Sequence, residues 1–312
     1  MRILTILLLV LILSGCGGYR YLDAPPIEFD QIDYGFDTKV TLSDPNIAYI
    51  DEGSGDKVLI LVHGLASNAG FWRYNIPELA KNYRVIAVDL PGYGKSGKGD
   101  YPYGMSWYAA AIREFIVELG LEDVTYIGHS MGGQIGIILA LEHPDIINRL
   151  ILASPAGIES FDRGQGDWLS SVITMKGVKT TTEEAIRRNL SINFYRWNTK
   201  WEWMVEERVR MAKAEEMAEF AYTVDRSVDA MLAEPTTSRL KNIKTPTLII
   251  YGKYDGLIPN PYLNPGHPSD VFRKGHDAIA GSELVEINRA GHMVQIEQPV
   301  DFNRAVLDFL KK

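Results

Sequence analysis

A single serine, Ser130, stands among four glycines in the stretch IGHSMGGQIG. The residues just before this stretch are β-branched and aromatic, which is typical of a buried strand, and the apolar residues after it indicate a helix that ends before Pro144. A serine at such a joint lies on a sharp turn, and glycine at positions 128 and 132 relieves the crowding beside it. The spacing therefore predicts that Ser130 presents its hydroxyl beyond the end of a strand.

A nucleophilic serine needs a base, because an unassisted hydroxyl is almost wholly protonated at neutral pH. Of the six histidines, His292 lies in the loop NRAGHMVQIEQP, directly after an apolar run and before the last helix. The imidazole in turn needs a carboxylate that fixes its tautomer and stabilises its charged form. Asp255 follows the apolar run TLIIYG by a few residues. Ser130, Asp255 and His292 are therefore the expected catalytic residues.

The elements that must position these side chains alternate along the chain. Strand-like runs cover residues 39–42, 47–51, 58–62, 84–89, 124–127, 150–153, 247–251 and 284–287. Helical patterns lie between most of them, which predicts a mostly parallel sheet with helices on both faces. The first two runs, joined by a turn at Asp44-Pro45-Asn46, are expected to form an antiparallel hairpin. The carboxyl ends of the parallel strands would bring the three catalytic residues to one edge.

The alternation stops between residues 155 and 238, where no strand-like run occurs and four of the six tryptophans lie. This segment is predicted to be a helical cap over the carboxyl edge of the sheet, inserted into a core domain of residues 36–154 and 239–312. An apolar stripe near Trp201 indicates one of its helices, with Glu207 expected on the opposite face.

The chain order Ser130, Asp255, His292 and the Gly-x-Ser-x-Gly turn resemble the α/β-hydrolase family across essentially the whole chain after residue 35. The stretch LILVHGLASNAGFW places a His-Gly pair after the third strand, where that family carries its oxyanion loop. The resemblance implies that the backbone N–H groups of Leu65 and Met131 stabilise the anionic tetrahedral intermediate.

Four residues in or after that loop are candidates for lining a substrate pocket: His63, Gly64, Phe71 and Trp72. Three of them have an alternative role. His63 could instead shape the loop, and the aromatic pair at 71 and 72 could instead pack in the core.

The residue at the turn separates reactions within the family. Relatives that open epoxides or displace halide carry aspartate there, so Ser130 favours acyl transfer. The expected reaction is hydrolysis of carboxylic esters, with hydrophobic acyl esters or monoacylglycerol-like lipids as substrates. Two alternatives stay open: a C–C bond hydrolase acting on meta-cleavage ring products, and a non-catalytic binding protein that kept the fold. The sequence does not fix the acyl length, the alcohol or the oligomeric state.

The sequence also argues against nucleic acids, nucleotides and metal ions as binding partners. The formal charge of −8 argues against nucleic acid, since phosphate binding needs a concentrated basic face. The stretch DLPGYGKSGK resembles a phosphate loop, but Asp89 stands where that motif requires its first glycine. There is no His-Glu-x-x-His motif. We therefore expect no cofactor and no metal.

The first residues form a distinct segment. Arg2 precedes an apolar run that is too short for a comfortable membrane span and ends in Leu-Ser-Gly-Cys. This pattern resembles a bacterial lipoprotein signal peptide over residues 1–15, which implies that Cys16, the only cysteine, carries lipid. Residues 16–35 are then a tether. The expected location is the bacterial cell envelope, lipid-anchored, with Gly17 favouring the outer membrane.

Overall fold

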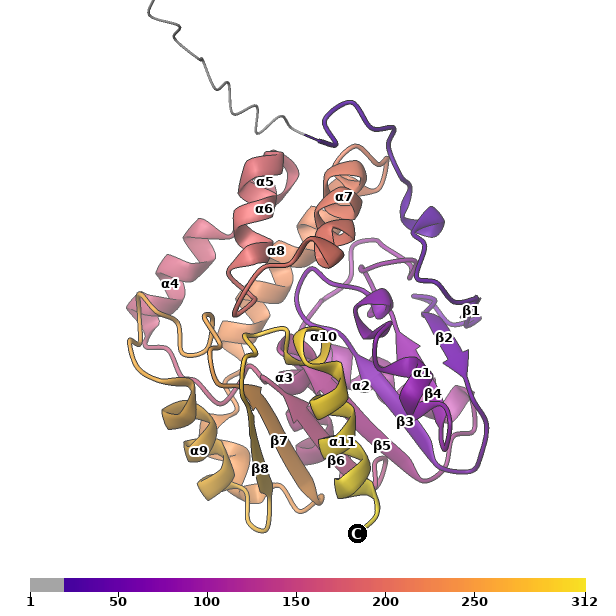
Figure 1. Cartoon of the computed structure of the whole chain (residues 1–312), viewed down its shortest axis with the longest axis vertical. Coiled ribbons are helices and arrows are strands. Elements are labelled where there is room, and N and C mark those ends of the chain that lie inside the picture. Colours follow the sequence, from indigo (N-terminus) through magenta and orange to yellow (C-terminus); the bar gives the residue numbers. More distant parts are fainter. Residues whose placement is uncertain (1–19) are drawn as a thin grey trace, which may run out of the picture.

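Eight strands form one sheet in the order β1-β2-β4-β3-β5-β6-β7-β8 (Figure 1). The strands are β1 Thr38–Val40, β2 Ala48–Glu52, β3 Val58–Val62, β4 Arg84–Val88, β5 Val124–His129, β6 Arg149–Ala153, β7 Thr247–Gly252 and β8 Glu283–Ile287. β2 pairs antiparallel with β1 and β4, and all pairs from β4 to β8 are parallel. The predicted fold class is confirmed, and each expected strand is present with ends that shift by one or two residues.

This computed structural model describes residues 20–312. The expected signal peptide, the expected lipidation site Cys16 and the first residues of the expected tether lie outside the described residues. Within residues 20–312, no helix combines the length and apolar character needed to cross a bilayer.

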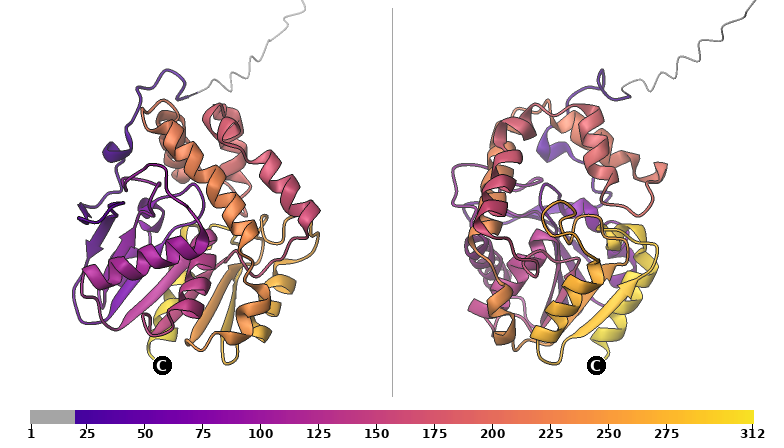
Figure 2. Two further views of the ribbon diagram at one scale, coloured as in Figure 1. Left: turned by 180° about the vertical axis from the view of Figure 1, so that it is seen from behind. Right: turned by 90° about the vertical axis from the view of Figure 1, so that its left-hand side faces the viewer.

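Helices cover both faces of the sheet, so its central strands are buried on both sides. These helices are α1 Ile76–Leu79, α2 Met105–Glu118, α3 Met131–Glu142, α9 Pro268–Ala278, α10 Val294–Glu297 and α11 Pro299–Leu310. α2 and α3 lie on one face, and α1 and α11 lie on the other (Figures 1 and 2). All residues of β3 and β5 are buried, which explains why both read as continuous apolar runs.

Five helices between β6 and β7 form the cap, which lies above the carboxyl end of the sheet (Figure 2). They are α4 Arg163–Val172, α5 Met175–Lys179, α6 Glu183–Ser191, α7 Glu202–Met211 and α8 Met217–Ala233. The cap shares an apolar cluster with the core: Trp201, Met204 and Val205 pack with Phe71 and Ile296. The cap is therefore fixed to the core by buried side chains.

The chain enters the fold along the cap. Residues 20–28, which we call the N-terminal strap, run beside α6 and α7 (Figure 1). The 3-10 helix Phe29–Gln31 follows, and Phe29, Ile32 and Tyr34 are at most 1% exposed. The described part of the expected tether is thus packed on the cap and then in the core.

Candidate active site

Ser130 lies between the end of β5 and the start of α3, on a backbone turn with φ 52° and ψ −117°. Positive φ is uncommon for a residue other than glycine and marks strain that the surroundings must hold in place. The two flanking glycines are required sterically. A Cβ at Gly128 would lie 2.3 Å from the Gly132 carbonyl oxygen, and one at Gly132 would lie 2.6 Å from the His63 carbonyl oxygen. The turn therefore needs both glycines to display the serine.

Asp255 and His292 lie in the loops after β7 and β8, and they contact each other. The His292 Nδ1 atom is 2.9 Å from Asp255 Oδ2. The other carboxylate oxygen of Asp255 accepts hydrogen bonds from the backbone N–H groups of Leu257 and Ile258, at 2.9 and 3.0 Å. Because a carboxylate only accepts, Nδ1 carries the proton and Nε2 is left as the basic nitrogen.

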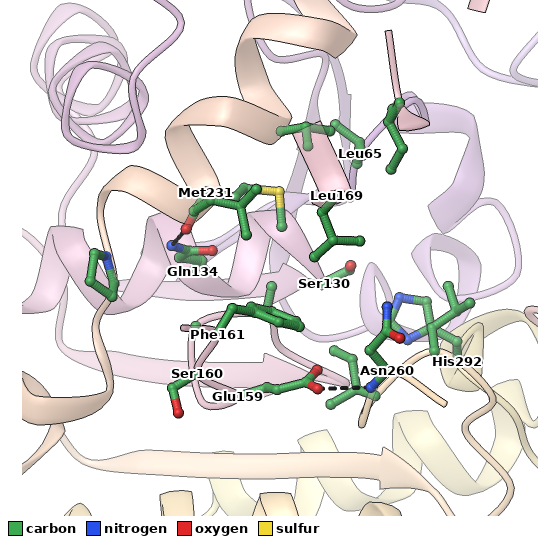
Figure 3. A pocket seen from close by; sticks show the side chains of 18 residues that line it. Leu65, Ser130, Gln134, Glu159, Ser160, Phe161, Leu169, Met231, Asn260 and His292 are labelled. Atoms are coloured by element: carbon green, nitrogen blue, oxygen red, sulfur yellow. Dashed lines mark hydrogen bonds between the residues drawn. The ribbon is translucent and has the colours of Figure 1, made fainter. Parts of the chain in front are cut away.

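Ser130 and His292 line the same cavity of about 280 Å³, together with Leu65 (Figure 3). The side chains of Asp255 and His292 are 0% and 4% exposed. The carboxylate is thus shielded behind the imidazole, and the serine faces the open space. The structure brings the three residues expected from the sequence to one edge of the sheet.

The two backbone N–H groups expected to hold an oxyanion flank this serine. Met131 is the first residue of α3, where a helix leaves its N–H groups without an intrahelical acceptor. Leu65 lies in the loop after β3 and lines the cavity with Ser130. Neither N–H donates to another group in the described chain. Both are therefore free to bind a developing negative charge.

His63 shapes this loop and does not line the cavity. Its Nδ1 is 2.7 Å from the Gly64 carbonyl oxygen, and its Nε2 accepts a hydrogen bond from the Leu90 N–H at 3.0 Å. Burial lowers its pKa to about 4. The neutral ring thus ties the loop after β3 to the loop after β4, and of the two alternatives considered for this residue the structure supports the structural one.

The proposed pocket role of Phe71 and Trp72 is not supported by the structure. Both side chains are buried, at 4% and 0% exposed, and neither lines the cavities that contain Ser130. The rings of Phe71 and the cap residue Trp203 meet edge to face, with their centroids 5.3 Å apart. Trp72 packs against Phe302 of α11. Both residues serve the packing of the core and the cap instead. Gly64, by contrast, does line a cavity that contains Ser130.

A second histidine, His129, lies beside the base. Its Nε2 is 3.0 Å from the His292 carbonyl oxygen, and the two ring centroids are 4.9 Å apart. Burial, followed by the nearby His292, lowers the pKa of His129 well below its usual value. The ring is therefore neutral and holds the backbone of the base. Sequence reasoning missed this role, although the residue directly precedes the serine.

Two cavities meet at Ser130 and share five further lining residues: Leu65, Ile173, Met231, Leu257 and His292. The smaller is lined mainly by apolar side chains and has the carboxylate of Glu159 at its edge (Figure 3). The larger, of about 530 Å³, extends beneath the cap helices α5 and α6. A substrate bound at the serine can therefore place one part in each cavity.

The larger cavity is lined by a partly buried cation that the sequence analysis did not single out. Arg208 on α7 lines it and donates a hydrogen bond to the Ala66 carbonyl oxygen in the loop after β3. It forms no ion pair with any described residue. Next to it, Glu207 accepts a hydrogen bond from Asn68 at 2.7 Å. The sequence analysis placed Glu207 on the face of α7 away from the apolar stripe, and in the structure the loop after β3, which carries Asn68, covers that position.

Comparison with known proteins agrees with this architecture. The family model of the alpha/beta hydrolase fold matches residues 57–299. The chain is 28% identical over 269 residues to a 2-hydroxy-6-oxo-6-(2'-aminophenyl)hexa-2,4-dienoic acid hydrolase from Metapseudomonas resinovorans, covering 85% of this chain and 87% of that protein.

Two solved structures are similar as well. An esterase from Exiguobacterium antarcticum superposes with a TM-score of 0.72 at 26% identity, covering 86% of this chain and 96% of the esterase. A meta-cleavage product hydrolase superposes with a TM-score of 0.71 at 27% identity, covering 88% of this chain and 97% of that hydrolase. From the family match over most of its length, the chain belongs to the α/β hydrolase fold family.

Proposed function

We propose that this hydrolase cleaves carboxylic esters through an acyl-enzyme formed on Ser130. The observation that supports this most directly is the placement of His292. Its Nδ1 is committed to Asp255, and the ring borders the same cavity as the serine. A base held in one tautomer beside a displayed hydroxyl is what nucleophilic attack on an acyl carbon needs.

In the first half of the reaction, Ser130 Oγ attacks the ester carbonyl carbon while His292 Nε2 takes the hydroxyl proton. Asp255 accepts the Nδ1–H hydrogen bond and stabilises the imidazolium. The carbonyl oxygen becomes an oxyanion, which the N–H groups of Leu65 and Met131 stabilise. Each such donor typically lowers the barrier by about 3 kcal/mol.

In the second half, the tetrahedral intermediate collapses and the ester C–O bond breaks. His292 returns its proton to the leaving alkoxide, so the alcohol departs neutral. Water then attacks the acyl-enzyme, with His292 again taking the proton, and a second collapse releases the carboxylic acid. Ser130 regains its proton in that step, and the enzyme is restored.

The two cavities support a particular class of ester substrate. The smaller one is lined by apolar residues such as Phe161, Leu169 and Leu257, which favour a hydrophobic group. The larger one gives the other half of the ester its own space beneath the cap. Hydrophobic acyl esters, monoacylglycerol-like lipids among them, fit this division best.

A C–C hydrolase is the second candidate, and one observation favours it. The guanidinium of Arg208 lines the larger cavity without a carboxylate partner among the described residues. A cation in that position suits an anionic substrate, and the hydrolase from Metapseudomonas resinovorans is named for a dienoic acid. The carboxylate of Glu159, which lines the smaller cavity, repels such an anionic substrate and so argues against this candidate.

Two measurements test these proposals. Labelling of the folded protein with a fluorophosphonate, with Ser130→Ala as the control, should depend on the serine; equal labelling of both proteins would refute the nucleophile. Rates on p-nitrophenyl esters of increasing chain length should then rise with acyl length. Negligible rates on every ester, with turnover of a ring-cleavage dienoate that Arg208→Gln abolishes, would favour the C–C hydrolase.

We also propose that the protein is anchored to the bacterial envelope by lipid on Cys16. The Leu-Ser-Gly-Cys sequence after a short apolar run supports this. Cells fed radiolabelled palmitate should incorporate label into the full chain but not into Cys16→Ser. Label in both proteins would contradict the proposed site.

A further inference from the structure

The N-terminal strap is fixed to the cap from its first described residue. The Glu183 carboxylate at the start of α6 accepts hydrogen bonds from the backbone N–H groups of Arg20 and Tyr21, both at 3.0 Å. Lys213, just after α7, donates from Nζ to the carbonyl oxygens of Leu22 and Ala24, both at 2.6 Å. The chain before Arg20 therefore joins the molecule at the cap, at the end opposite to the C-terminus (Figure 1).

The distance from this point to the proposed anchor is short. Three residues separate Arg20 from Cys16 in the sequence. Because a fully extended chain advances at most about 3.6 Å per residue, the two Cα atoms lie within about 14 Å of each other. A lipid chain on Cys16 would therefore hold the cap, rather than the base of the sheet, next to the bilayer.

The outer surfaces of the strap and of the cap helices α4 and α5 carry exposed apolar and basic side chains. Leu22, Trp168 and Val172 are 57%, 45% and 51% exposed. On α5, Lys176 and Lys179 are exposed, and neither forms an ion pair with a described residue. Three basic residues and one acidic residue lie between residues 163 and 179, which form α4 and α5, although the formal net charge of the whole chain is −8. We call this surface, formed by the strap with α4 and α5, the cap face.

The cap face also borders the catalytic cavity. Leu22 and Lys179 line a surface groove whose walls include Thr181 and Ile186. The same Thr181 and Ile186 line the larger cavity that reaches Ser130. Val172 at the end of α4 lines that cavity as well. Leu22 of the strap, Lys179 and Val172 thus border the approach to the serine.

From this juxtaposition we propose that the cap face lies on an anionic lipid bilayer, so that ester substrates pass from the bilayer to Ser130 between the cap helices. The inference rests on the proposed lipid anchor and deepens the proposed ester hydrolysis. Exposed apolar side chains enter the interfacial region of the bilayer, and unpaired lysines are attracted to anionic headgroups.

The orientation can be measured without any activity. The full lipidated chain is placed in vesicles of phosphatidylethanolamine and phosphatidylglycerol, with one added cysteine carrying a fluorophore and with nitroxide-labelled lipids as quenchers. Leu22→Cys and Trp168→Cys should be quenched severalfold more than Val300→Cys, a control on α11 that is 71% exposed. The parent chain should take up no fluorophore, because lipid blocks its only thiol. Equal quenching at all three positions would overturn the proposal.

Rates give a second, independent test. Lys176→Gln with Lys179→Gln should slow hydrolysis of an ester embedded in anionic vesicles, relative to water-soluble p-nitrophenyl acetate, by roughly fivefold per lysine, the equivalent of about 1 kcal/mol each. Lys241→Gln with Lys244→Gln, exposed at the base of the sheet, should leave that ratio unchanged. An equal change in both pairs would refute the cap face. Absence of p-nitrophenyl acetate hydrolysis in the parent would instead refute the ester hydrolase, and the quenching contrast would still stand.

Discussion

Glu207 on the cap helix α7 accepts a hydrogen bond of 2.7 Å from the side-chain amide of Asn68, in the loop that also carries Leu65. The contact joins the cap to the loop that supplies one expected oxyanion donor. Burial raises the pKa of Glu207 to about 7, against its ordinary 4.5. A nearby Asp89 carboxylate also raises this pKa, while the guanidinium groups of Arg73 and Arg208 lower it.

The burial of Glu207 makes stability depend on pH. Because the pKa of Glu207 is higher in the folded state, the folded state binds more protons between about pH 4.5 and pH 7, and the group's contribution to the unfolding free energy falls as the pH rises through that range. Glu207→Gln keeps an acceptor for Asn68 without the charge. We expect it to raise the melting temperature by a few degrees at pH 8 and to leave it nearly unchanged at pH 5, as measured by calorimetry.

A matched control for this experiment is Glu184→Gln, an exposed position one helix away. It should leave the melting temperature unchanged at both pH values. If Glu207→Gln changed the melting temperature by the same amount at pH 5 and pH 8, the charge of the Glu207 carboxylate would not be the cause of the pH dependence.

The sequence was sufficient to place Ser130, Asp255 and His292 on one edge, because each follows a recognisable strand and parallel strands end on the same side. Glu159 follows the parallel strand β6 in the stretch PAGIES, so the same reasoning also predicts that it lies at this edge. The sequence analysis did not include this residue. The contact of Glu207 with Asn68 could not be predicted, for a different reason. Helical periodicity separates two faces but does not say that a core loop covers the second one.

The aromatic residues show the same limit. Phe71 and Trp72 follow the oxyanion loop, so their position in the chain allowed either the pocket or the core. What decides between them is the 3-10 helix Ala69–Trp72, which turns both rings away from the serine toward Trp203 and Phe302. Such a choice depends on packing between segments far apart in the chain, and spacing carries no record of it.

Asp255→Asn should lower kcat by about 10³ to 10⁴ while the fold is retained. The amide can donate to His292 Nδ1, which favours the tautomer with the proton on Nε2 and removes the base. The measurement is the rate on p-nitrophenyl butyrate, with near-ultraviolet circular dichroism as the check on folding. Asp255→Asn combined with His292→Ala should be no slower than His292→Ala alone, since the two residues act as one unit. Additive losses would argue against the pairing.

His129 should act as a positioning residue for the base. Its Nε2 donates to the His292 carbonyl oxygen at 3.0 Å, and a hydrogen bond of this kind is worth about 1 kcal/mol. We expect His129→Phe to lower kcat roughly five- to tenfold with little change in KM, and His129→Gln, which keeps a donor, to recover part of the loss. A rise in KM with unchanged kcat would place the residue in substrate binding instead.

Glu159 should select against substrates that carry negative charge in the smaller cavity. Its Oε1 accepts hydrogen bonds from the Asn260 N–H and the Asn264 side-chain amide, both at 2.8 Å, so the carboxylate is held in place at the cavity (Figure 3). Two like charges at about 7 Å repel by about 2 kcal/mol at an effective dielectric constant of 20. Glu159→Gln keeps an acceptor and removes the charge. At pH 8 we expect it to raise kcat/KM for a p-nitrophenyl ester with a terminal carboxylate by roughly thirtyfold, and to leave kcat/KM for the uncharged methyl ester of the same length unchanged.

The pH dependence of this selectivity provides the internal check. Burial raises the pKa of Glu159 above its ordinary value, so the group takes up its proton at a higher pH than a free carboxylate does. As the pH falls and Glu159 becomes neutral, the parent enzyme should approach the Glu159→Gln variant in its preference between the two esters. A preference that differs by the same factor at every pH would mean that the shape of the side chain, and not its charge, selects the substrate.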